Sequence, residues 1–68
     1  MNTVVYEEIY RDIAKQLFPL GLPGWITEAG RQRAHYEIAE VTLCALRDMG
    51  QFDGDPLVEA RKAPLTDW

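Results

Sequence analysis

Residues 27–49, TEAGRQRAHYEIAEVTLCALRDM, decide the fold of this 68-residue chain. Apolar side chains recur at helical spacing between Ala34 and Met49, which predicts one long helix over 27–49. Thr27 is a suitable N-cap, and Gly50 is a typical stop directly after the helix. At 100° per residue the apolar positions cover roughly 200° of the helix circumference, about twice what a surface helix needs. The excess apolar surface predicts that this helix packs against more than one partner.

A second helix is expected over 3–18, before a break that is rich in proline and glycine. Two prolines and two glycines lie within residues 19–24, and such a cluster ends a helix and forces a turn. The two helices therefore form a hairpin. The apolar stripe expected on the 3–18 helix consists of Tyr6, Ile9, Tyr10, Ile13 and Leu17.

A short third helix is expected over 56–63. Asp55 is placed as its N-cap, and Pro56 stands at the first helical position, where its missing N–H costs nothing. No segment shows a competing alternation typical of strands. We therefore predict an all-α fold with one domain over 1–68, built as a helical hairpin of two main helices plus a short C-terminal helix.

The small size of the chain predicts that it associates with a second copy. A domain of this length buries only about 60 % of the surface that its unfolded chain exposes, and small domains commonly add disulfides, metals or oligomeric contacts. Cys44 is the only cysteine and His35 the only histidine, so we expect no internal disulfide, no metal site and no cofactor. We expect a homodimer through the 27–49 helix. Its predicted interface residues are Ile38, Ala39, Thr42, Leu46 and Met49.

The sequence offers no set of catalytic residues, and we predict that the protein is not an enzyme. The chain contains no serine. Cys44 and His35 stand nine residues apart on opposite sides of one helix, so they cannot form a thiol–imidazole pair within one chain. Asp53 and Asp55 resemble the start of a calcium-binding loop, but the position of the closing glutamate is taken by Pro64.

One basic cluster, over residues 30–36, is the candidate binding site. Arg31 and His35 continue the line of the apolar arc, and two interpretations remain open. Either the apolar seam ends there and these side chains reach solvent or pair across a dimer, or they belong to a surface that binds another protein. Arginine and aromatic residues are frequent energetic anchors of such surfaces. The predicted protein-binding residues are Trp25, Arg31, Arg33, His35 and Tyr36.

Charge and hydropathy argue against nucleic acid and membrane as partners. Seven basic and eleven acidic residues give a net charge of −4, whereas nucleic-acid binding depends on basic side chains that neutralise phosphates. No stretch approaches the roughly 18 apolar residues of a membrane span, and the first residues lack the features of a signal peptide. A lone thiol fits a reducing compartment, so we expect a cytoplasmic protein.

In size, charge and hairpin organisation the chain resembles small acidic helical proteins of phages and other mobile elements, such as anti-CRISPR and anti-quorum-sensing inhibitors. The resemblance rests on no motif, and no residue role is carried over from it. It implies a compact, often dimeric protein that inhibits or modulates a host protein without chemistry. One alternative is a small transcriptional or DNA-associated regulator, which Arg31, Arg33 and His35 would favour. The other is an antitoxin or adaptor subunit.

Overall fold

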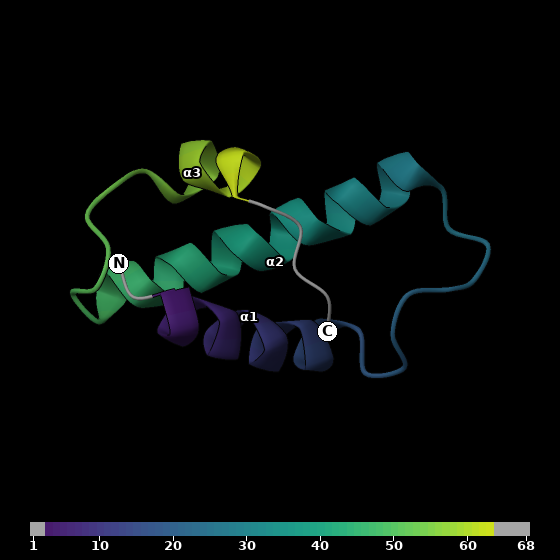
Figure 1. Cartoon of the computed structure of the whole chain (residues 1–68), viewed down its shortest axis with the longest axis horizontal. Helices are drawn as coiled ribbons and strands as arrows, with labels where there is room; N and C mark the ends of the chain where they lie inside the picture. The colour runs from purple at the N-terminus through teal and green to yellow at the C-terminus, as the bar shows by residue number, and fades with distance from the viewer. Residues whose placement is uncertain (1–2, 64–68) are drawn as a thin grey trace.

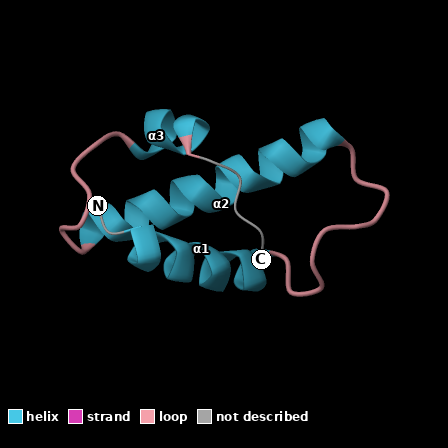
Figure 2. Ribbon diagram, in the orientation of Figure 1, coloured by secondary structure: helices cyan, strands magenta, loops and turns pink. Residues whose placement is uncertain are grey.

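The computed structural model describes residues 3–63 and contains three helices within that range. These are α1 (Thr3–Leu17), α2 (Glu28–Asp48) and α3 (Pro56–Lys62). Helices α1 and α3 both pack against α2, on two sides of it (Figure 1). Helix and loop are the only secondary structure in this part of the chain (Figure 2). The all-α prediction is confirmed, and each predicted helix end lies within one residue of the observed one. Residues 1–2 and 64–68 of the predicted domain lie outside the described residues.

Both ends of α2 are fixed by side-chain and backbone caps that the sequence predicts. The Thr27 hydroxyl accepts a hydrogen bond from the Gly30 backbone N–H at 3.1 Å. After the helix, Gly50 has a φ of 76°, which L side chains rarely adopt. Its N–H donates to the Arg47 carbonyl, and the next N–H donates to the Leu46 carbonyl. This pair of bonds is the Schellman arrangement, and it satisfies two carbonyls that the helix leaves without partners.

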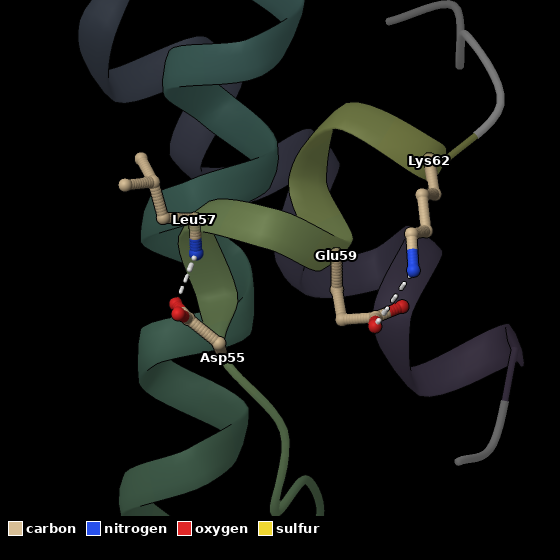
Figure 3. Close-up of polar contacts among 4 residues, drawn as sticks. All are labelled: Asp55, Leu57, Glu59 and Lys62. Carbon is tan, nitrogen blue, oxygen red and sulfur yellow. Dashed lines mark hydrogen bonds and ion pairs between the residues drawn. The ribbon is translucent and has the colours of Figure 1, made fainter.

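Helix α3 begins as the sequence predicts and packs through its small side chains. Asp55 caps it by accepting from the Leu57 N–H at 3.0 Å (Figure 3). The buried residues are Pro56 and Ala60, whereas Leu57 and Val58 are exposed. Small side chains therefore let α3 approach α2 closely. The Glu59–Lys62 ion pair on its surface, at 3.7 Å, contributes little because both side chains are solvated.

The core fills the space between α2 and its two neighbours. Helix α1 contributes residues spaced four apart, Tyr6, Tyr10 and Ala14, which are buried. Ile9 and Ile13 of the predicted stripe lie partly buried at the edge of this core. Leu17, which was predicted to belong to the stripe, is 49 % exposed. The remaining core residues are Ile38, Ala39, Leu43, Leu46 and Ala60.

The predicted dimer interface is largely buried inside one chain. Ile38, Ala39, Thr42 and Leu46 have no exposed surface, and only Met49 of the five predicted interface residues is exposed. The expectation that these four side chains face a second copy is therefore corrected. It assumed that the hairpin partner covers only one side of the wide apolar arc, but α3 covers the other side. The homodimer itself stays a prediction.

The third helix covers only part of α2. The carbonyl of Ala63, just after α3, lies 3.2 Å from the ring of His35, so α3 ends level with the second turn of α2. The first turns of α2 extend beyond both other helices (Figure 1). The core is consequently three helices deep at one end of the molecule and two helices deep or less near the connection between α1 and α2.

Replacing Gly50 with alanine should lower the free energy of unfolding by about 1–2 kcal/mol, because an L residue is strained at its positive φ. Urea denaturation measures the effect. The matched control is Gly24→Ala, where φ is not positive and an added Cβ meets no atom within 4 Å. That variant should be as stable as the wild type or slightly more stable. Equal losses in the two variants would contradict the role of Gly50.

Candidate functional site

The only histidine of the chain is a buried connection between the three helices. His35, on α2, is 1 % exposed. Its Nδ1 lies 2.7 Å from the Tyr10 hydroxyl on α1. Its Nε2 lies 3.2 Å from the Ala63 carbonyl at the end of α3. One imidazole ring therefore bonds to both helices that pack on α2.

The partners of His35 determine where its proton lies. The Ala63 carbonyl has no hydrogen to give, so Nε2 carries the N–H and donates to it. In the neutral ring Nδ1 then has a free lone pair, and the Tyr10 hydroxyl donates to it. Both ring nitrogens are satisfied by groups of the protein itself. This arrangement explains how a polar ring is accommodated in the core.

This placement corrects the prediction that His35 belongs to a protein-binding surface or reaches solvent. The sequence correctly put His35 in line with the apolar arc, but the burial of that line by α3 was not foreseen. Tyr10 was recognised only as an apolar stripe residue, and its hydroxyl role was missed. The sequence did contain a signal for this role. A single histidine in line with apolar residues needs a hydrogen-bond partner if that line is buried.

Tyr6 lies beside Tyr10 in the core, and its hydroxyl has no hydrogen-bond partner among the described residues. The rings of Tyr6 and Tyr10 lie 5.9 Å apart and tilted by 38°. Tyr6 is 6 % exposed. Burial raises the pKa of Tyr6 above its usual 10.0, because the phenolate would lose its hydration.

The buried rings of Tyr6, Tyr10 and His35 serve a structural role. Within residues 3–63, no three His, Cys, Asp or Glu side chains gather where they could hold a metal ion. Cys44 is a free, partly buried thiol on the far side of α2 from the imidazole. The hydrogen bonds of His35 are both used within the protein. These three rings therefore hold the helices together, and the candidate binding residues are those on the surface.

The most unusual surface lies at the connection between α1 and α2. Leu20 is 98 % exposed and Trp25 is 83 % exposed, although both are large apolar side chains. We call this region the loop end and define it as residues 17–33. In Figure 1 the connection projects away from the three helices. Neither side chain folds back on the core, because α3 does not reach this end of the molecule.

Two tight turns present these apolar side chains. The Gly21 N–H donates to the Phe18 carbonyl at 2.9 Å, which places Leu20 third in a four-residue turn. The Ile26 N–H donates to the Pro23 carbonyl at 3.1 Å, which places Trp25 third in another. Proline in or at the start of each turn restricts the backbone further. The connection is therefore held in shape while its largest side chains face outward.

The predicted binding residues on α2 separate into surface and edge positions. Arg31 and Arg33 are exposed on the first turns of α2, next to the connection that carries Trp25. Tyr36 is 36 % exposed, and its ring lies 5.8 Å from the ring of His35, at the edge of the core. Trp25, Arg31 and Arg33 thus lie on the loop end, Tyr36 borders it, and His35 is excluded from it.

Comparisons with protein-family models, with curated proteins and with solved structures find no match to this chain. No residue role is therefore transferred from a relative. Among the described residues, no helix combines the length and apolar character that crossing a bilayer requires. The exposed side chains of the loop end are the most informative features for function.

Tyr10→Phe should lower the free energy of unfolding by about 1–3 kcal/mol, because it leaves the buried Nδ1 of His35 without its donor. The matched control is Tyr6→Phe, which removes a buried hydroxyl that has no partner. This second variant should be within about 0.5 kcal/mol of the wild type, or more stable. Chemical denaturation at neutral pH compares them. A Tyr10→Phe protein as stable as Tyr6→Phe would show that His35 does not depend on this bond.

Tyr6 should make stability fall at alkaline pH. In the unfolded chain its hydroxyl ionises near 10.0, whereas in the folded chain burial holds the proton to higher pH. The unfolded state therefore binds fewer protons above pH 10, and the free energy of unfolding decreases as pH rises through that range. Denaturation between pH 8 and 11 should show a steeper decline for the wild type than for Tyr6→Phe. Parallel curves would contradict the assignment.

Proposed function

We propose that this chain is a non-enzymatic protein-binding module that inhibits or modulates a partner protein by docking the loop end into it. The observation that carries the proposal is the exposure of Leu20 and Trp25 at neighbouring turns. Large apolar side chains that remain in water at the tip of a structured segment are typical anchors of protein interfaces. Full burial of a side chain such as leucine contributes about 1.5–3 kcal/mol.

The shape of the loop end supports binding with a low ordering cost. Its two turns are closed by backbone hydrogen bonds, and Gly21, at the end of the first turn, has a φ of 76° that glycine adopts readily. A segment that already holds its bound shape loses less conformational entropy on association. Trp25 also has only two side-chain torsions to immobilise, so it adds contact area at a low cost in conformational entropy.

A DNA-associated regulator is the alternative, and the exposure of Arg31 and Arg33 favours it. Two features weigh against this function. The connection between α1 and α2 spans residues 18–27, whereas a helix-turn-helix motif uses a turn of three or four residues. The net charge of −4 also opposes binding to a polyanion. We therefore favour a protein partner.

Trp25 should crosslink to the partner in the native host. The experiment replaces Trp25 with a photoreactive phenylalanine analogue and uses the same replacement at Leu57 as the control. Leu57 is an exposed apolar residue of α3, a helix that lies away from the connection between α1 and α2 (Figure 1). A discrete adduct at position 25 and none at position 57 would identify the partner. Adducts at both positions, or at neither, would contradict a binding surface at the loop end.

Binding to the purified partner should then weaken at least tenfold with Trp25→Ala, because the anchor loses most of its apolar area. The matched variant Leu57→Ala should bind like the wild type. Calorimetry measures both affinities, and denaturation should show that Trp25→Ala folds normally, since this side chain is exposed. Equal weakening by the two variants would argue against docking through the loop end.

A further inference from the structure

The charges of the chain are divided unevenly along its sequence. Residues 13–36 carry three basic side chains and one acidic one, Glu28, which gives a net charge of +2. The rest of the sequence carries four basic and ten acidic side chains, which gives −6, and the two values sum to the total of −4. The basic members of the first group are Lys15, Arg31 and Arg33.

The fold puts the basic group and the exposed apolar anchors at the same end of the molecule. Because α1 and α2 form a hairpin, the end of α1 and the start of α2 lie at the same end of the molecule (Figure 1). Arg31 and Arg33 are exposed there, and neither forms an ion pair with another residue of the 3–63 range. Two free guanidinium groups thus accompany Trp25 and Leu20 on the loop end.

We infer that the partner presents an apolar pocket with an acidic rim, into which Trp25 and Leu20 insert while Arg31 and Arg33 pair with carboxylates around it. This inference rests on the proposed function and specifies the chemistry of the partner's surface. Arginine suits the task because its planar guanidinium binds a carboxylate through two parallel hydrogen bonds. Peripheral charges of this kind accelerate association and exclude wrong partners.

The acidic remainder of the chain favours a compact acidic pocket over an extended polyanion. A nucleic acid that runs past the loop end would approach the other described residues, 3–12 and 37–63, whose four basic and nine acidic side chains give −5, and would be repelled. A protein pocket contacts the loop end alone and avoids that repulsion. The same charge division orients the chain during its approach, with the loop end toward the acidic site.

Selection of peptides against the full chain tests this inference without knowledge of the partner. A random dodecapeptide display library is selected on the wild type and depleted on the double variant Leu20→Ala/Trp25→Ala, so that only binders of the two anchors remain. The expected peptides combine apolar residues with an excess of Asp and Glu. Their synthetic forms should bind at least tenfold more weakly to Arg31→Glu/Arg33→Glu, and more weakly at high salt.

Charge reversal provides the decisive comparison. A selected peptide in which Asp and Glu are replaced by Lys should recover at least part of its binding to Arg31→Glu/Arg33→Glu. The matched control is Arg47→Glu, an exposed arginine toward the other end of α2, which should bind the original peptide like the wild type. Each variant is first shown to fold by circular dichroism.

The outcomes separate the inference from the proposed function. Binders that need Trp25 but are neutral or basic, or that tolerate reversal of both arginines, would overturn the acidic pocket and leave the binding surface intact. The absence of any binder that depends on Leu20 and Trp25 would count against the loop end as a docking surface. Titration with a fifteen-nucleotide thymidine oligomer completes the test, and binding that is lost in Arg31→Glu/Arg33→Glu would assign the loop end to nucleic acid instead.

Discussion

The structure depends on one buried imidazole that joins all three helices. His35 accepts from Tyr10 on α1 and donates to the Ala63 carbonyl at the end of α3. A buried ring nitrogen without a partner would cost more than its hydrogen bond gains, so both neighbours must be in place when α2 is buried. This requirement couples the hairpin to the short third helix, which has only Pro56 and Ala60 as buried residues of its own.

The same connection explains why the molecule has two unlike ends. Helix α3 ends just before Ala63, whose carbonyl meets His35, and beyond that level nothing covers the first turns of α2 among the described residues. The deep core lies at the opposite end, around Leu43 and Leu46. A chain of 68 residues has limited apolar surface to distribute, and here it leaves Leu20 and Trp25 outside the core. The exposure of Leu20 and Trp25 and the shallow core near the connection both follow from the position at which α3 packs on α2.

Local signals in the sequence were sufficient for the helices and their ends. Thr27 and Asp55 cap the helices that they precede, since a short polar side chain satisfies N–H groups only a few residues away. Gly50 ends α2 because the required positive φ is a property of a single residue. The exposure of the predicted binding residues followed from the sequence in part. Trp25, Arg31 and Arg33 are on the surface as predicted, because charged and loop residues rarely find room in a small core.

The sequence by itself determined where the helices begin and end, that the 27–49 segment has apolar surface for more than one partner, and that a basic group stands beside the connection. Only the tertiary structure decided which partners cover that surface. It buried Ile38 and Leu46 within one chain, and it placed His35 inside the core and Leu20 outside it. The physical reason is the distance along the chain over which each effect acts. Caps and turns depend on residues only a few positions apart. Burial depends on which distant segments pack at the same place, and the helical period of one segment does not contain that information.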